Sequence, residues 1–338
     1  MKYAIGIDIG GTKISVALGT SSGKILAHDE IKTRKGWDVP LCLNELKGCV
    51  ETLIKNSRIP LSKIIGIGIC LPGAVDTRRA VVPVSPHLEG WFSIPLGKLL
   101  SRRFGLPVKM ANDANAAAIA EKVFGEGRGI KNFIYMTVST GVGGGIVIDG
   151  KLLEGSSYVA GEVGHMTIEA HGEKWKLGEI GVLEAYASGT AIAKFVTERI
   201  RGKSAAYRKQ FADEKGKISA RSVKSAAHRG NKLALEAFGR AGFYLGIGVA
   251  NLLNILNPEK IILGGGVLRS APAVFWETFR KTCRRRSWKQ AHQNVQIVQT
   301  KLGKKVGNLG ALALVFEECG NGKRKIFRHR HGRVSAKP

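Results

Sequence analysis

The feature of this chain that most constrains its fold is a hairpin pattern that occurs twice. Each copy has a short apolar, β-rich run, a glycine turn and a second β-rich run. The copies lie at 3–9, 10–11 and 13–18, and again at 133–138, 141–145 and 146–148. Because strand and helix patterns follow both hairpins, the repeat predicts two similar α/β halves with a cleft between them.

The segments outside the hairpins alternate between strand and helix patterns. We expect strands at 25–31, 64–69, 107–111 and 261–263, and helices at 41–55, 114–123, 183–200, 231–256 and 308–316. These patterns predict a smaller N-terminal α/β domain of residues 1–115 plus 305–320, a larger α/β domain of residues 116–304, and a hinge near 112–118. The last segment, 321–338, is basic and contains no acid, so we expect a disordered tail.

Composition argues against several classes of protein. A chain of 338 residues with 44% hydrophobic and 23% charged residues is typical of a globular protein with room for two domains. No run approaches 18 apolar residues and the chain opens on a strand pattern, so we expect neither a membrane span nor a signal peptide. The five cysteines are scattered without a C-x-x-C pair, which favours a reducing cytoplasm.

The net charge of +27 is the unusual part of the composition. A basic excess of this size is typical of proteins that bind nucleic acid. Here the basic residues are spread over 199–232, 280–289 and 323–337, without helix-turn-helix, zinc-finger or RNA-binding spacing. We interpret them as solvated faces whose field favours an anionic ligand, and we expect no nucleic-acid partner; polyanion binding is the less favoured alternative.

An acid stands between two amides directly after the predicted strand 107–111. The tetrapeptide reads Asn112-Asp113-Ala114-Asn115, and a helix pattern follows at once. An aspartate at such a junction either caps the helix or serves as a base aimed into a cleft. Capping is the favoured interpretation of the tetrapeptide alone, and the glycine turns elsewhere in the chain reverse that preference.

Three glycine-rich turns follow predicted strands. Residues 8–13 read Asp-Ile-Gly-Gly-Thr-Lys, residues 139–145 read Ser-Thr-Gly-Val-Gly-Gly-Gly, and residues 263–267 read Leu-Gly-Gly-Gly-Val. Glycine turns expose backbone N–H groups that can cradle a phosphate. A P-loop does not fit, because the Gly-Lys-Ser/Thr ending is missing, and a dinucleotide-binding fold is disfavoured, because strands flank the turn at 139–145.

Asp8 lies inside an apolar strand pattern, where an unpaired carboxylate is costly. A Mg²⁺ ion near the phosphates would offset that cost. The alternative is a plain hairpin turn in which Asp8 is a local cap.

A polar cluster in the second half is suited to a polyol. Glu162 and His165 flank a glycine in a turn, and Glu184 lies at the start of a predicted helix. Together these side chains offer hydrogen bonds to several hydroxyl groups. Taken singly, His165 is more often a core histidine, and Glu184 an ordinary acid of a first helical turn.

These motifs, in this order, resemble the ROK family (repressors, open reading frames and sugar kinases) from Ile5 to about Phe316. The segments 71–76 and 85–91 add to the resemblance. It implies an actin-like, ribonuclease H-like ATPase fold with two α/β domains and an interdomain cleft. It also implies that Asp113 is the catalytic base and that the terminal helix returns to pack on the first domain.

The resemblance assigns the remaining site residues as well. The sugar would be held by Asn112, Glu162, His165, Glu184 and Gly73. ATP would lie across Gly10, Gly11, Thr12, Lys13, Thr140, Gly141, Gly143, Gly264 and Gly265, with Asp8 beside Mg²⁺. A homodimer is a further expectation from the family.

One stretch departs from the family pattern. Where the family has a Cys-Gly-Cys-Gly-x-x-Gly-Cys zinc loop completed by a histidine, residues 175–182 read Trp-Lys-Leu-Gly-Glu-Ile-Gly-Val. Trp175, Leu177 and Val182 thus stand at the three cysteine places. Because His165 alone cannot hold tetrahedral zinc, we predict no structural zinc, an apolar cluster as the anchor of this loop, and a substrate role only for His165.

We therefore predict a cytoplasmic hexose kinase that uses ATP and Mg²⁺ to phosphorylate the C6 hydroxyl of glucose. N-acetylmannosamine or N-acetylglucosamine is the alternative substrate, to be decided by the pocket around Pro72-Gly73 and 87–91. The alternative from another class is a non-catalytic, sugar-sensing regulator. ROK repressors carry an N-terminal DNA-binding extension, and we expect no room for one before the strand that begins at residue 3.

Overall fold

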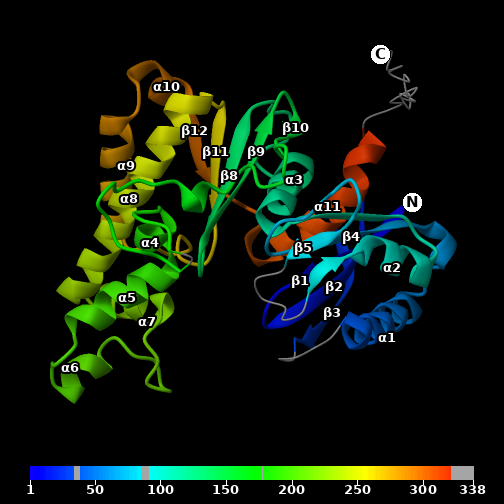
Figure 1. The fold of residues 1–338 in the computed structure, drawn as a ribbon, viewed down its shortest axis with the longest axis horizontal. Coiled ribbons are helices and arrows are strands. Elements are labelled where there is room, and N and C mark those ends of the chain that lie inside the picture. Colours follow the sequence, from blue (N-terminus) through cyan, green and yellow to red (C-terminus); the bar gives the residue numbers. More distant parts are fainter. Residues whose placement is uncertain (34–38, 85–90, 177, 321–338) are drawn as a thin grey trace, which may run out of the picture.

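The computed structural model describes residues 1–33, 39–84, 91–176 and 178–320. Two five-stranded mixed sheets lie in opposite halves of the molecule, with helix α3 (Asp113–Phe124) between them (Figure 1). In each sheet the first three strands of the orders given below pair antiparallel, and the remaining strands are added parallel to them. The two similar halves that the repeated hairpin predicts are confirmed.

The first sheet has the strand order β3-β2-β1-β4-β7. Its strands are β1 (Tyr3–Ile9), β2 (Lys13–Thr20), β3 (Ile25–Lys32), β4 (Ile64–Leu71) and β7 (Val108–Asn112). One face is covered by α1 (Val39–Ser57) and α2 (Leu96–Phe104), and the other by α11 (Val306–Gly320) and α3. A short 3₁₀ helix (Leu61–Lys63) and the hairpin of β5 (Val82–Val84) and β6 (Phe92–Ile94) complete this half.

The alternation of isoleucine and glycine along β4 explains how both faces are covered. Ile67 and Ile69 point into the core beneath α1 and α2. Gly68 faces α11, where an added Cβ would lie 1.7 Å from the carbonyl oxygen of Ala311. Since side chains alternate between the faces of a strand, the bulky residues fill one core and the glycine lets a helix backbone approach on the other.

The second sheet has the strand order β10-β9-β8-β11-β12. Its strands are β8 (Phe133–Val138), β9 (Val142–Ile148), β10 (Lys151–Leu152), β11 (Lys260–Gly264) and β12 (Gln296–Gln299). Alternate residues of β8 again serve two cores: Ile134 and Met136 join the large helical core, and Phe133 and Tyr135 pack against α3.

The helices of this half gather mainly on the outer face of the second sheet (Figure 1). They are α4 (Glu184–Ala187), α5 (Gly189–Arg199), α6 (Ala205–Lys209), α7 (Ala220–His228), α8 (Lys232–Leu256), α9 (Ala273–Arg286) and α10 (Lys289–Asn294), with 3₁₀ helices at Val163–His165 and Gly303–Lys305. By length and composition α8 is apolar enough to cross a membrane. More than half of its most apolar stretch is buried in this core, as in the core helix of a globular fold.

Two predicted elements are wrong in detail. The helix predicted at 183–200 is broken at Ser188, whose backbone is extended (ψ 162°) and whose Oγ caps α5 by accepting from the N–H of Ala191 at 3.0 Å. The strand predicted at 146–148 begins at Val142, so Gly143 lies in β9 and not in the turn before it. A run of glycines can form either a turn or a strand. Here the pairing with β8 makes Gly143 part of the strand β9.

The predicted return of the terminal helix is confirmed, because α11 packs on the first sheet and on α3. The predicted domain limits stay a prediction, since α3, which contains the proposed boundary, packs against both sheets. The predicted tail at 321–338 and most of the motif at 85–91 lie outside the described residues.

Candidate active site

Asp113 lies at the point where β7 ends and α3 begins. The helix cap is its neighbour: Asn112 Oδ1 accepts from the N–H groups of Ala114 at 2.9 Å and Asn115 at 3.4 Å. Asp113 is the first helical residue, and its Oδ1 accepts a bond from Ala114 N at 2.7 Å. The capping interpretation of Asp113 is therefore corrected in favour of Asn112, and the aspartate side chain remains exposed.

Asn112 also connects two of the predicted sugar-binding residues. Its Nδ2 donates to the carbonyl oxygen of Gly73 at 3.0 Å. Gly73 has a φ of 93°, a conformation that side chains with a Cβ rarely adopt. Because Oδ1 is used by the cap, one N–H of the Asn112 amide is what this side chain can still offer to a ligand.

The environment of Asp113 makes it a stronger base than an ordinary aspartate. The carboxylate reaches the surface but lies among many protein atoms, and this burial raises its pKa from 3.8 to about 6. The hydrogen bond from Ala114 N opposes the rise, and the carboxylates of Asp8 and Glu162 add to it. An accessible carboxylate with a pKa near 6 can accept a proton from a substrate at neutral pH.

Asp8 lies on β1 beside Asp113 and has few partners. Its Oδ1 accepts a weak bond from Cys70 Sγ at 3.4 Å, and its Oδ2 lies against Gly307 in the first turn of α11. Burial raises the pKa of Asp8, against the opposing effects of Cys70 and Lys13. A buried carboxylate with so few donors fits a Mg²⁺ ion, which uses one or two carboxylates together with phosphate oxygens and water.

The first glycine turn is an exposed tip between β1 and β2. Gly10 N donates to the Lys13 carbonyl oxygen at 2.9 Å, while the N–H groups of Gly11 and Thr12 make no hydrogen bond within the described residues. These two groups are available to a phosphate. The Lys13 ammonium, predicted to serve the phosphates, is paired with Glu30 at 2.5 Å.

The other two glycine turns lie side by side at the end of the second sheet. Val267 N donates to the carbonyl oxygen of Val138 at 3.0 Å, which joins the turn at 264–266 to the turn at 139–141. Gly265 has a φ of 104°, and an added Cβ there would lie 2.2 Å from the same carbonyl oxygen. The structure thus brings together two turns that are far apart in the sequence.

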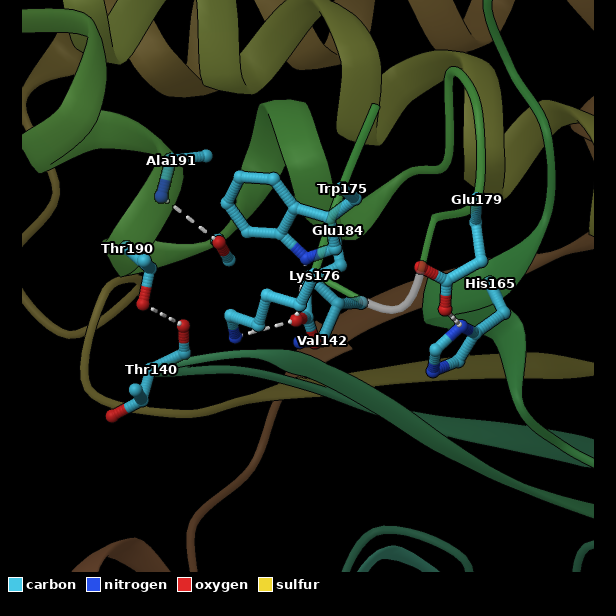
Figure 2. Close-up of polar contacts among 10 residues, drawn as sticks. Thr140, Val142, His165, Trp175, Lys176, Glu179, Glu184, Thr190 and Ala191 are labelled. Carbon is cyan, nitrogen blue, oxygen red and sulfur yellow. Dashed lines mark hydrogen bonds and ion pairs between the residues drawn. The ribbon is translucent and has the colours of Figure 1, made fainter. Parts of the chain in front are cut away.

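Glu162 is the residue before the short 3₁₀ helix Val163–His165 and His165 is its last residue; both are exposed. Glu162 is near enough to Asp113 to raise its pKa. His165 Nδ1 lies 2.9 Å from Glu179 Oε1 (Figure 2). The expectation that His165 has a substrate role only is therefore incomplete, since one ring nitrogen is bound to Glu179, while the other has no hydrogen-bond partner within the described residues.

Glu184 is held by three hydrogen-bond donors. Its Oε1 accepts from Trp175 Nε1 at 2.9 Å and from Lys176 Nζ at 3.0 Å, and its Oε2 accepts from Val142 N at 3.0 Å (Figure 2). Burial disfavours the charged form, but these donors outweigh it and lower the pKa of Glu184.

The predicted apolar anchor of the loop at 175–182 is confirmed for two of its three residues. Val182 is buried with Ala185 and Tyr186, and Trp175 packs against this cluster. Leu177 lies outside the described residues. Sequence reasoning missed the polar roles of Trp175, Lys176 and Glu179; the signal was present, since two opposite charges occur in a loop next to predicted sugar-binding residues.

Within the described residues no group of three His, Cys, Asp or Glu side chains could hold a metal ion.

Two segments that carry predicted sugar-binding residues also touch across the two halves. Thr77 Oγ1 donates to Glu154 Oε1 at 2.6 Å. The Tyr158 hydroxyl is hydrogen-bonded to Asp76 and helps to lower the pKa of that acid, after the larger effect of the Arg79 N–H. The site is therefore built where the halves meet.

Comparisons with known proteins agree with this arrangement. The family model described as the ROK family matches residues 4–318. A glucokinase from Halalkalibacterium halodurans is 37% identical over 274 residues, which are 81% of this chain and 83% of that protein. A xylose repressor from Caldicellulosiruptor bescii is 33% identical over 318 residues, which are 93% of this chain and 78% of the repressor.

A solved structure shows the same fold. The crystal structure of a ROK family glucokinase from Streptomyces griseus in complex with glucose and AMPPNP has a TM-score of 0.77 and 32% identity, and covers 92% of this chain and 98% of that one. The paired half-folds are thus those of the actin-like ATPase fold with two domains. Since the family model spans nearly the whole sequence and relatives above 30% identity cover most of it, this chain belongs to the ROK family.

Proposed function

We propose that this protein is an ATP-dependent hexose kinase that phosphorylates the C6 hydroxyl of glucose. The observation that carries the proposal is Asp113: an exposed carboxylate with a pKa of about 6, beside Asp8 and Glu162. The likeness to glucokinases supports a sugar kinase as the class of enzyme.

In this proposal Asp113 acts as the general base. As the C6 oxygen bonds to the γ-phosphorus, its proton passes to Asp113 and the bond from phosphorus to the ADP oxygen breaks. Asn112, Gly73, Glu162, His165 and Glu184 orient the sugar, and orientation of this kind supplies much of the rate enhancement in phosphoryl transfer. Asp8 would hold Mg²⁺, whose charge would offset that of the transferring phosphoryl group.

The phosphates of ATP are assigned to the three turns. The N–H groups of Gly11 and Thr12 have no hydrogen-bond acceptor in the part of the chain that the structure describes. We assign the remaining contacts to Gly10, Lys13, Thr140, Gly141, Gly143, Gly264 and Gly265. Lys13 would have to leave Glu30, which costs little because the pair is exposed.

The compartment and the assembly are proposals of the same kind. We place the enzyme in the cytoplasm, because Cys42, Cys49, Cys70 and Cys283 are free thiols. A homodimer is carried over from the family resemblance.

A coupled ADP-release assay tests the proposal. The panel is glucose, mannose, fructose, N-acetylglucosamine and N-acetylmannosamine, each with MgATP. Glucose should give the highest kcat/KM. A higher value with an N-acetylhexosamine would correct the substrate and keep the reaction.

The second candidate is a sugar-sensing regulator without catalysis, which the likeness to a xylose repressor favours. A DNA mobility shift at low and high salt separates it from the kinase, since phosphate contacts weaken steeply with salt. A salt-sensitive shift together with no ADP release from any sugar would replace the proposed kinase with this regulator.

A further inference from the structure

The loop that follows residue 173 reaches both sides of the sugar site through direct polar contacts. Trp175 and Lys176 bind Glu184, and Glu179 binds His165 (Figure 2). The loop therefore touches two of the proposed sugar ligands without a metal between them.

The acceptor positions of Glu184 are nearly filled. A carboxylate offers about four hydrogen-bond positions, and Trp175, Lys176 and Val142 occupy three of them. The Glu184 side chain is only 14% exposed, so water cannot easily replace a lost donor. Removal of a loop donor would leave Oε1 under-bonded and free to turn.

The Trp175 donor is itself fixed. Trp175 N donates to the Glu179 carbonyl oxygen at 2.7 Å, and Gly178 N donates to the Trp175 carbonyl oxygen at 3.1 Å, which closes the loop as a tight turn. The indole packs on the cluster of Val182 and Tyr186. The Lys176 side chain, by contrast, is 52% exposed. It contributes a positive charge beside Glu184 but fixes the position of that carboxylate less than the indole does.

Glu184 also lies against a proposed phosphate turn. An added Cβ at Gly141 would lie within 2.4 Å of Glu184 Oε2, and Val142 N binds that oxygen. The orientation of Glu184 is thus set from two directions, by the loop on Oε1 and by the start of β9 on Oε2. Loss of the loop donors leaves the contact with β9 in place.

We propose that Trp175 and Lys176 are positioning residues of the sugar site, which hold the Glu184 carboxylate in its binding orientation through two direct hydrogen bonds. The inference rests on the proposed function in one respect, namely that Glu184 binds the sugar. Because the effect passes through a sugar ligand, it should appear in sugar affinity and KM more than in kcat.

The test compares two changes in the loop with two matched controls. Trp175→Phe removes the indole N–H and keeps a ring, and Lys176→Met removes the ammonium from a side chain that is half exposed. The controls are Trp276→Phe, a partly buried tryptophan that packs edge-on against Phe275 and Phe279, and Lys174→Met, an exposed lysine; within the described residues neither side chain has a hydrogen bond or ion pair. Lys176→Arg restores a cationic donor.

We expect the sugar KM and the calorimetric Kd to rise about tenfold for Trp175→Phe and about threefold for Lys176→Met, with kcat changed less than threefold. The controls and Lys176→Arg should stay close to the wild type. Equal behaviour of all five variants would overturn the proposal, as would a fall in kcat with unchanged sugar affinity.

The sugar affinity separates this inference from the proposed function. If the wild-type protein binds a sugar but releases no ADP, the kinase fails while the binding constants still decide the role of the loop. If it binds no sugar of the panel, both proposals fail.

Discussion

At the scale of the residue, the chemistry depends on how Asp113 combines access with basicity. Its side chain reaches the surface, where a substrate can contact it. Burial among protein atoms and the nearby carboxylates of Asp8 and Glu162 raise its pKa. Asn112 leaves it free to act, because the cap of α3 is supplied by the amide and not by the acid.

Asp113→Asn should lower kcat by about 10²–10⁴-fold, because the amide cannot accept the proton of the hydroxyl. Sugar affinity should stay within about threefold, since the change keeps size and shape. ADP release and calorimetry measure the two quantities. Asp149→Asn is the matched control: Asp149 is exposed in a turn with a φ of 49°, which asparagine tolerates. Wild-type kcat in Asp113→Asn would rule out the general-base role.

The same residue predicts the dependence of activity on pH. A base must be unprotonated, so kcat/KM should fall tenfold per pH unit below about pH 6, the pKa of Asp113. An aspartate with an ordinary pKa would keep its activity to about pH 4. A profile that is flat down to pH 5 would contradict this prediction.

Folding provides the control for the pH profile. Because the pKa of Asp113 is raised in the fold, the folded state binds the proton more tightly than the unfolded chain. Protonation of this group as pH falls through 6 therefore favours folding. Circular dichroism at each pH should show an intact fold while activity is lost.

At the scale of the element, β4 shows why a glycine can be required in a strand. Gly68→Ala should lower the free energy of unfolding by about 1–3 kcal/mol or more, because the new Cβ meets the backbone of α11 and not a movable side chain. Gly48→Ala is the matched control on α1, where nothing lies within 4 Å. It should raise the stability by about 0.5–1 kcal/mol, and urea unfolding measures both. A neutral Gly68→Ala would contradict the close approach of α11.

The loop at 175–182 predicts how the protein responds to chelators. A zinc-selective chelator should change neither Tm nor kcat, because Trp175 and Val182 join an apolar cluster and Lys176 binds Glu184 directly. EDTA should abolish turnover by removing Mg²⁺ from ATP and leave Tm unchanged. Stoichiometric zinc in the purified protein by atomic absorption would disprove the first expectation.

At the scale of the whole molecule, the proposed sugar ligands come from both halves. Gly73 and Asn112 lie in the first half, and Glu162 and Glu184 in the second. The contact of Thr77 with Glu154 already joins the segments that carry Gly73 and Glu162. A sugar that touches both halves should therefore draw them together.

Binding of glucose should reduce the radius of gyration in X-ray scattering and raise the stability by about 2.7 kcal/mol at 100 times Kd. Scattering and thermal unfolding, with and without glucose, measure the two effects. A sugar that the enzyme does not bind is the control. An unchanged radius at saturating glucose would show that the site forms without closure.

The elements of the fold that depend on local sequence patterns are predictable, and those that depend on contacts between distant segments are not. The hairpin of β1 and β2 and the helix α8 are predictable because period-two runs, glycine turns and a long helical pattern at 231–256 are local signals. The break at Ser188 was missed, since it depends on Gly189 N reaching the Ser139 carbonyl oxygen at 2.7 Å, a contact 50 residues away in the chain. The early start of β9 depends in the same way on its pairing with β8.

The sequence by itself determined the two hairpins with glycine turns, the acid between two amides at the start of α3, and the absence of cysteines from the loop at 175–182, because each is a matter of residue identity and short-range spacing. The tertiary structure decided which residue caps α3, how far the pKa of Asp113 rises, and which donors reach Glu184. These depend on charges and hydrogen-bond partners that come from distant parts of the chain, and their strength falls off within a few ångströms.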